Sequence, residues 1–215
     1  MEQVQLAAPV LKKNDEFAAE NRAWFAARGW TVVNLMSAPG AGKTTLLERT
    51  LPLLASRRRC AVIEGDIQTD LDAARIRAAG ADAAQINVNS CHLDARSVGE
   101  AARRLESVRP DLLFIENIGN LVCPAAYDLG EAWRVTVFSA AEGADKPKKY
   151  PKMFLQSDAV VINKIDLLPY CDVSLEELLA NVRDVSPRAE IFPLSARTGA
   201  GLDAWAAWAA ARGGR

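Results

Sequence analysis

A glycine-rich loop with lysine and threonine is the strongest chemical signal in the sequence. Residues 37–45 read SAPGAGKTT and match the Gly-Lys-Thr end of the P-loop pattern, with Ser37 where the pattern usually has glycine. Gly40 and Gly42 let the backbone wrap phosphate oxygens, while Lys43 supplies charge and Thr44 a hydroxyl for Mg²⁺. The alternative is a glycine-rich turn that happens to carry lysine. The predicted phosphate-binding residues are Gly40, Ala41, Gly42, Lys43, Thr44 and Thr45.

A second motif indicates which base the nucleotide carries. Residues 163–166 read NKID and follow an apolar run, and Asp166 could accept two hydrogen bonds from guanine that adenine cannot donate. The pair Ser195 and Ala196 resembles the GTPase loop whose backbone N–H contacts the guanine carbonyl. The alternatives are a solvated turn or an adenine-nucleotide kinase in which Asp166 plays no part. The predicted guanine-binding residues are Asn163, Lys164, Asp166, Ser195 and Ala196.

Acidic residues stand at the ends of two further apolar runs, where a magnesium carboxylate is expected. Asp66 and Glu116 are the candidates beside Thr44, and the residues alone do not choose between them. Nothing corresponds to the water-orienting glutamine of Ras, so Gln68 and Asp72 are possible substitutes. We therefore expect slow, Mg²⁺-dependent hydrolysis of GTP to GDP and phosphate. The predicted catalytic residues are Lys43, Asp66, Asp72 and Glu116.

These motifs require a scaffold in which strands and helices alternate. The pattern predicts an α/β fold with a mostly parallel sheet flanked by helices, because several strand-length runs are apolar throughout. The expected strands are Thr31–Ser37, Cys60–Glu64, Ala83–Val88, Asp111–Glu116, Arg134–Ser139, Ala159–Asn163 and Glu190–Leu194. The expected helices are Asn14–Arg28, Lys43–Ser56, Leu71–Ala79, a stretch from Cys91 to about Val108, Leu175–Val185 and Gly201–Arg212.

The first of these helices precedes the first core strand. Asn14 is expected to cap it, with an apolar stripe formed by Phe17, Trp24 and Phe25. We interpret residues 1–29 as a docking helix and residues 30–215 as a P-loop GTPase domain with an embedded metal site, together forming one structural domain.

Composition excludes several classes of protein. The 215 residues are 50% hydrophobic and 25% charged with a net charge of −1, so nucleic acid and acidic membranes are not expected as partners. We find no apolar stretch of membrane-spanning length and no secretory signal, and we expect a cytoplasmic location. The four cysteines lack Cys-x-x-Cys spacing, and the single histidine, His92, directly follows Cys91.

Several longer strings resemble HypB, the family of hydrogenase nickel incorporation GTPases. They are EGDIQTDLDAARI at 64–76, CHLDA at 91–95, ENIGNLVCP at 116–124, EGADKP at 142–147 and KYP at 149–151. The resemblance runs from about Asn14 to near the C-terminus. It implies a SIMIBI-like G domain of the P-loop NTPase class, and a GTP-dependent homodimer that works with a nickel chaperone and the hydrogenase large-subunit precursor.

The resemblance also implies a metal site formed by Cys91, His92 and Cys123. Thiolate and imidazole suit Ni²⁺ and Zn²⁺, and ligand type does not choose between them. Without the resemblance, Cys91 and Cys123 would be interpreted as buried thiols, as we interpret Cys60 and Cys171. Many members of the family carry an N-terminal cysteine cluster or a histidine-rich stretch, but this sequence has no cysteine before residue 60. We therefore expect no nickel storage.

The sequence thus predicts a GTP-hydrolysing metallochaperone that gates nickel insertion into the hydrogenase large-subunit precursor. One alternative is a urease-accessory nickel GTPase, a family that carries Cys-Pro-His rather than adjacent Cys91 and His92. Another is a metal-buffering binding module with a structural nucleotide site. Two hypotheses remain open for Lys146 and Lys149. They either contact the partner's nucleotide across a dimer or cap a solvated loop.

Overall fold

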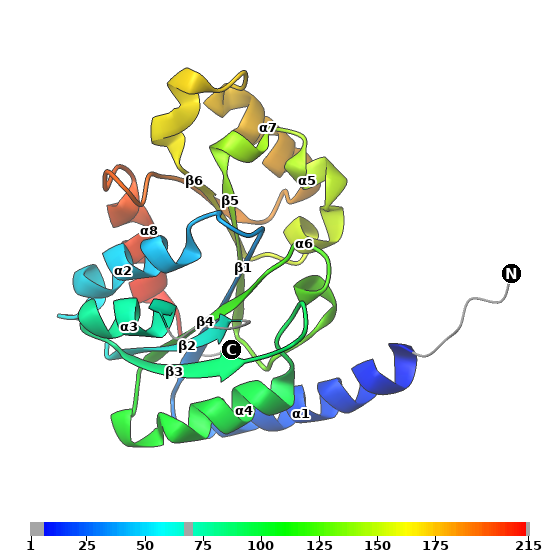
Figure 1. Cartoon of the computed structure of the whole chain (residues 1–215), viewed down its shortest axis with the longest axis vertical. Coiled ribbons are helices and arrows are strands. Elements are labelled where there is room, and N and C mark those ends of the chain that lie inside the picture. Colours follow the sequence, from blue (N-terminus) through cyan, green and yellow to red (C-terminus); the bar gives the residue numbers. More distant parts are fainter. Residues whose placement is uncertain (1–6, 67–70, 214–215) are drawn as a thin grey trace, which may run out of the picture.

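A seven-stranded sheet forms the centre of the computed structural model, which describes residues 7–66 and 71–213 (Figure 1). The strand order is β3-β2-β4-β1-β5-β6-β7, and every neighbouring pair is parallel. The predicted α/β class is confirmed. The strands are β1 Thr31–Ser37, β2 Cys60–Asp66, β3 Asp82–Asn87, β4 Leu112–Gly119, β5 Trp133–Ser139, β6 Ala159–Asn163 and β7 Glu190–Pro193.

Helices cover both faces of this sheet. One face carries α2 Lys43–Leu54, α3 Leu71–Ala78 and α8 Leu202–Ala211. The other carries α1 Ala7–Ala27 and α4 Ala95–Arg104, which lie side by side in Figure 1, and further along α5 Lys146–Lys149, α6 Pro151–Leu155 and α7 Leu175–Val185. Short 3₁₀ turns are η1 Glu106–Val108, η2 Pro124–Ala126, η3 Ala140–Glu142 and η4 Ile165–Tyr170. Among the described residues, no helix is long and apolar enough to cross a bilayer.

The alternation of side chains along β2 and β4 decides what each face of the sheet can do. Glu64 of β2 pairs in register with Glu116 of β4, so both side chains project to the face that α2 covers. Gly65 and Asn117, one residue further on, belong to the opposite face, where α1 and α4 pack. Adjacent residues of one strand therefore serve two different sites.

The predicted capping role of Asn14 is wrong. The helix α1 begins at Ala7, and Asn14 lies in its interior with only 6% of its surface exposed. Its side chain bonds to backbone groups of two distant loops, which a rule based on local sequence does not anticipate. The apolar end of α1 packs into the core, where Phe25 contacts the cluster that contains Trp30 and Val32. The division of the chain at residue 29 stays a prediction.

The helix expected to follow Cys91 starts later than the sequence suggested. It begins at Ala95, with Asp94 as its N-cap, because the Asp94 carboxylate accepts the Ser97 N–H at 2.8 Å. Cys91 and His92 consequently lie in the loop between β3 and α4. A loop leaves their side chains free of helical packing, which suits residues that have to meet a cysteine from another part of the chain.

Candidate nucleotide and metal sites

The glycine-rich loop joins the end of β1 to the start of α2. Gly40 and Gly42 adopt φ angles of +73° and +96°, which side-chain-bearing residues rarely take. Gly42 has a second requirement, since a Cβ there would lie 2.6 Å from Asn163 Nδ2. Backbone conformation and close approach both demand glycine at this position.

Lys43 and Thr44 are buried at the first turn of α2, with 7% and 9% of their surfaces exposed. Lys43 Nζ donates to Ser37 Oγ at 2.8 Å and lies 3.8 Å from Glu116 Oε1. Thr44 Oγ1 donates to the same Glu116 oxygen at 2.9 Å. Serine at position 37, the departure from the usual pattern, thus holds the lysine ammonium. The helix N-terminus adds partial positive charge for a phosphate.

Glu64 and Glu116 form a pair of buried carboxyl groups beneath these side chains. Burial, and then the neighbouring charge of Glu116, raise the pKa of Glu64 to about 10. Burial also raises the pKa of Glu116, against the opposing effects of the Lys43 charge and the Thr44 hydrogen bond. One oxygen of each group, Glu64 Oε1 and Glu116 Oε2, is buried without a hydrogen-bond partner among the described residues.

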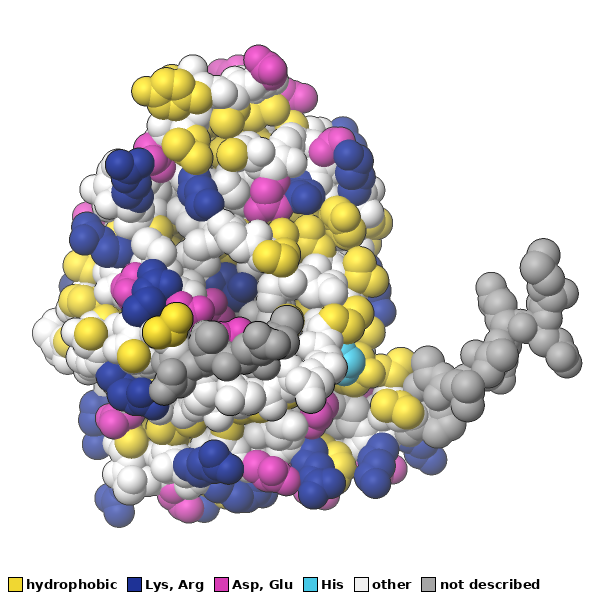
Figure 2. Space-filling view, in the orientation of Figure 1, with side chains coloured by type: hydrophobic (Ala, Val, Ile, Leu, Met, Phe, Trp, Pro, Cys, Tyr) yellow, Lys and Arg dark blue, Asp and Glu magenta, His cyan; other side chains and the backbone are white. Residues whose placement is uncertain are grey.

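A cavity of about 520 Å³ opens above this pair. Its lining includes Asp66 and Asp72, and Asp72 Oδ1 accepts from Arg75 Nη1 at 2.8 Å. Arg75 also grips Glu48 with two bonds of 2.9 and 2.7 Å, which fixes α3 to α2. Figure 2 shows basic and acidic side chains gathered in a hollow of this face. Gln68, the other possible water-positioning residue, lies outside the described residues.

Asn163 links the segments of the predicted guanine site. Its Nδ2 donates to Ala41 O at 2.9 Å, and its Oδ1 accepts the N–H groups of Lys164 and Ala196 at 2.8 and 3.0 Å. Lys164 Nζ donates to Gly40 O at 2.7 Å, so its chain spans the phosphate loop. Asn163 therefore joins the phosphate loop to the loop that contains Ala196. The Ala196 N–H, which was predicted to contact guanine, donates to Asn163 in this structure.

Asp166 meets the requirement for a guanine acceptor. Its Oδ1, in the first turn of η4, is buried without a hydrogen-bond partner among the described residues, so this acceptor is left unsatisfied by them. The adjoining Ile165 N–H bonds to Leu194 O at 3.3 Å, which brings the motif beside Ser195. The donor set at the phosphate end, Thr44 with the two glutamates, consists of oxygens, which Mg²⁺ prefers. The residues present thus fit both a guanine nucleotide and Mg²⁺.

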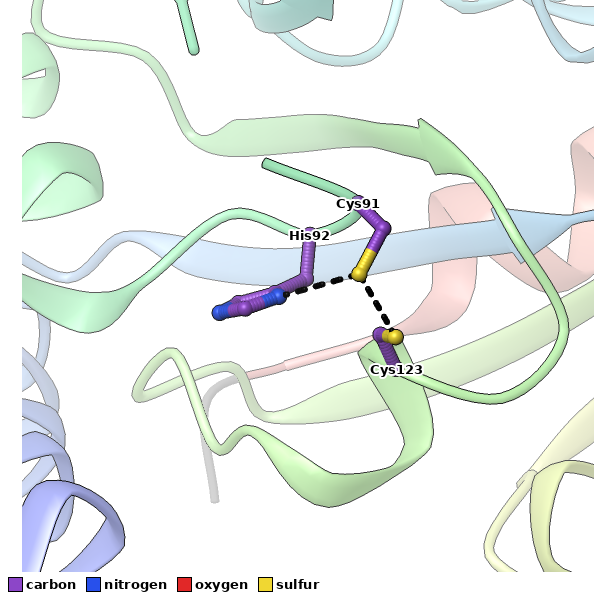
Figure 3. A group of neighbouring side chains, drawn as sticks. All are labelled: Cys91, His92 and Cys123. Carbon is purple, nitrogen blue, oxygen red and sulfur yellow. Dashed lines mark hydrogen bonds between the residues drawn. The ribbon is translucent and has the colours of Figure 1, made fainter. Parts of the chain in front are cut away.

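The predicted metal ligands meet at one point although they come from two distant segments (Figure 3). The ligand atoms of Cys91, His92 and Cys123 all lie within 4.8 Å of one another. Cys91 Sγ is 2.6 Å from Cys123 Sγ and 3.7 Å from His92 Nδ1. The hydrogen bond from Cys91 is the main cause that raises the pKa of the Cys123 thiol. Cys60 and Cys171 lie outside this group, and burial raises the pKa of Cys60 to about 12.

A tyrosine supports the histidine of this group. The His92 ring stacks on Tyr127 with centroids 3.7 Å apart and an interplanar angle of 24°. Burial lowers the pKa of His92, although the Asp94 carboxylate opposes this effect. The neutral imidazole is the form that binds a metal. Cys91 is exposed, and His92 and Cys123 are partly exposed, so the group is accessible from solvent.

Several known proteins are similar to this chain over most of its length. The profile described as "CobW/HypB/UreG, nucleotide-binding domain" matches residues 31–193. Hydrogenase maturation factor HypB of Azotobacter vinelandii is 55% identical over 206 residues, which cover 95% of this chain and 68% of that protein. The chain belongs to the HypB family of hydrogenase maturation factors.

Two solved HypB structures share the fold closely. HypB from Helicobacter pylori in complex with nickel gives a TM-score of 0.86 at 38% identity and covers 91% of this chain and 93% of that one. Hydrogenase maturation factor HypB from Archaeoglobus fulgidus gives a TM-score of 0.85 at 36% identity, and the match covers 92% of this chain and 97% of that one. The match to this profile identifies residues 31–193 as a nucleotide-binding domain.

Sequence reasoning missed several residues that shape these sites. Glu64 could have been found, because a carboxylate that directly follows the apolar run of β2 is an unusual residue to bury. Arg75 could have been singled out only because it belongs to residues 64–76, one of the segments that resembles the HypB family. Tyr127 gave none, since its contact with His92 depends entirely on how two loops meet.

Proposed function

We propose that this chain is a GTP-hydrolysing metallochaperone that gates nickel insertion into a hydrogenase large-subunit precursor. One observation carries the proposal. The strand β4 holds Glu116 against Thr44 in the nucleotide site, and the segment that continues from its end carries Cys123 to Cys91 and His92. A change at the phosphate end of β4 therefore acts on a segment that supplies a metal ligand.

The nucleotide half works mainly by positioning and charge. Lys43 and the phosphate-loop N–H groups bind the β- and γ-phosphates, while Asp166 selects guanine. Magnesium, when bound through Thr44 and a carboxylate from Glu116 or Asp66, neutralises charge on the phosphates. Asp72, held by Arg75, is the candidate for orienting the attacking water. Without a glutamine in that role, intrinsic turnover is slow.

The metal half holds nickel as cargo. Three ligands from one chain leave a tetrahedral site without its fourth ligand. When a GTP-dependent homodimer forms, the three ligands of each chain meet at the interface. The nickel bound to the Helicobacter pylori relative supports nickel as the cargo, and Zn²⁺ is its competitor for a thiolate and imidazole site. The partners are a nickel chaperone and the precursor, and the cytoplasm is the proposed location.

The test measures size and nickel content together. The full chain is sized with GDP and with a non-hydrolysable GTP analogue, each with and without Ni²⁺. We expect a dimer with the analogue and stoichiometric nickel, which is lost in the Cys91→Ala, Cys123→Ala double variant. Cys171→Ala is the matched control, since it removes a half-buried cysteine outside the group. Stoichiometric nickel on the double variant would refute the metal assignment, and a monomer under all conditions would refute the dimer.

A metal-buffering module with a structural nucleotide site is the alternative. It predicts that bound GTP persists unhydrolysed, with and without nickel. Phosphate release from GTP in a single-turnover assay separates the two, because only the proposed enzyme converts its bound nucleotide.

A further inference from the structure

Two buried asparagines of α1 face the loops that surround the metal group. Asn14 and Asn21 expose 6% and 4% of their surfaces, although α1 otherwise buries apolar side chains such as Phe25. A buried amide destabilises a fold unless its polar atoms find partners, so leucine would pack a helix more simply. The partners of these two amides show what the polar side chains are used for.

Asn14 bonds to both segments that carry the His92–Tyr127 stack. Its Oδ1 accepts the Ala95 N–H at 2.9 Å, and its Nδ2 donates to Asp128 O at 2.7 Å. Ala95 lies three residues after His92, and Asp128 directly follows Tyr127. One side chain thus joins the two loops whose rings stack.

Asn21, further along the same helix, repeats this arrangement. Its Nδ2 donates to Ala95 O at 2.6 Å and to Leu129 O at 3.0 Å. Ala95 is therefore held by both its N–H and its carbonyl from α1. Arg22 adds an ion pair to the Asp128 carboxylate at 2.8 Å.

Two glycines make room for Asn21. A Cβ at Gly130, which has a φ angle of +87°, would lie 2.7 Å from Asn21 Cβ, and one at Gly99 would collide with Asn21 Oδ1. These glycines lie on the two elements that the asparagine joins, the loop before β5 and the helix α4. A side chain larger than hydrogen at either glycine would leave too little space for Asn21.

We infer that Asn14 and Asn21 are positioning residues of the metal site, acting through the backbone of the Cys91–Ala95 and Tyr127–Leu129 loops. This inference rests on the proposed function, because it assumes that Cys91, His92 and Cys123 bind metal. The helix α1 fixes the angle and height of the His92 ring on Tyr127, and hence where the imidazole stands relative to the two thiols. Groups behind the ligands of a metal commonly change its affinity about 10–100-fold when they are removed.

The experiment compares nickel affinity in full-length Asn14→Leu and Asn21→Leu variants, by competition with a chromophoric chelator. We expect about 10-fold or weaker nickel binding in each, with an altered thiolate-to-nickel charge-transfer band. GTP affinity stays within about twofold of wild type, because neither asparagine lines the phosphate cavity. Phe25→Leu is the matched control: it loosens the core packing of α1 but removes none of the hydrogen bonds from α1 to the two loops, and its nickel affinity stays at the wild-type value.

The outcomes separate this inference from the function on which it rests. Wild-type protein that binds no nickel at the three ligands would overturn the proposed function and this inference with it. Wild-type binding together with unchanged affinity and spectrum in both variants would overturn the inference alone, as would an equal loss in Phe25→Leu. If Asn14→Leu does not bind GTP, and hence has not folded, Asn14→Ser replaces it with the same expected direction.

Discussion

The proposed nucleotide site and the proposed metal site of this chain are built in opposite ways. Lys43, Thr44 and Glu116 are buried and bonded to one another, on rigid elements that meet at the edge of a parallel sheet. Cys91 is exposed, and its group lies in loops before α4 and after β4. A site that performs chemistry on phosphates benefits from fixed charges in a dry surrounding. A site that passes its ion onward needs ligands that a partner can reach.

The two sites also differ in what supports them. The residues of the phosphate loop follow one another in the chain, so a βα unit alone nearly defines their geometry. The metal ligands depend on two loops that α1 joins through Asn14 and Asn21. Substitutions should therefore damage one site without the other.

The largest effect is expected from Lys43→Ala. It removes the buried charge that faces the phosphates, and GTP turnover should fall by about 10²-fold or more. Single-turnover phosphate release measures the loss, and nickel binding measured without nucleotide should be unchanged. The control is Lys152→Ala, which removes an exposed lysine of α6. Turnover of Lys43→Ala within about fivefold of wild type would contradict the assigned role.

Asp166→Ala should weaken GTP binding by about 10²-fold or more, because two hydrogen bonds from guanine to a carboxylate contribute roughly 1.5–3 kcal/mol each. ATP binding should change little, so the preference for GTP narrows. Competition between the two nucleotides measures it, with the exposed Asp172→Asn as control. An unchanged preference would show that another residue reads the base.

Gly42→Ala and Gly80→Ala form a matched pair. Both introduce a Cβ at a φ angle near +90°, and each should lose about 1–2 kcal/mol of unfolding free energy from backbone strain. Only Gly42→Ala also pushes on Asn163, at 2.6 Å, whereas the space around Gly80 is open. Denaturant unfolding should give similar losses from strain, while nucleotide titration should show roughly 10-fold weaker binding for Gly42→Ala alone. Equal nucleotide binding by the two variants would remove Asn163 as the link to the phosphate loop.

The last prediction concerns the pH dependence of stability. Glu64 keeps its proton to a pKa of about 10 in the folded state, against 4.5 for an ordinary carboxyl, so the native state binds more protons than the unfolded state between these values. The contribution of Glu64 to the free energy of unfolding is therefore present at low pH and is lost as the pH rises from about 4.5 to about 10. Glu64→Gln should flatten that decline in denaturant unfolding without nucleotide or Mg²⁺, because an amide does not titrate. A slope identical to that of the wild-type chain would show that Glu64 ionises in the native state.

Local sequence was sufficient to predict where the candidate nucleotide-site residues lie, but not which contacts hold the loops of the candidate metal group. Lys43, Thr44 and Asp166 follow strands whose apolar runs predict their position, and parallel strands bring those ends together. Asn14 illustrates the limit, since a short polar residue before an apolar stripe fits a cap, and only tertiary packing places it inside a longer helix. The contact of Tyr127 with His92 has the same origin, because no pattern along the chain brings the two loops together.

The connection between the two sites is tested most directly by nickel affinity in two nucleotide states. Wild-type chain is titrated with Ni²⁺ in the presence of Mg²⁺ and either GDP or a non-hydrolysable GTP analogue. If β4 couples Glu116 to the segment that carries Cys123, the two dissociation constants should differ by about fivefold or more. Two dissociation constants that agree within about 1.5-fold would contradict nucleotide-gated metal binding.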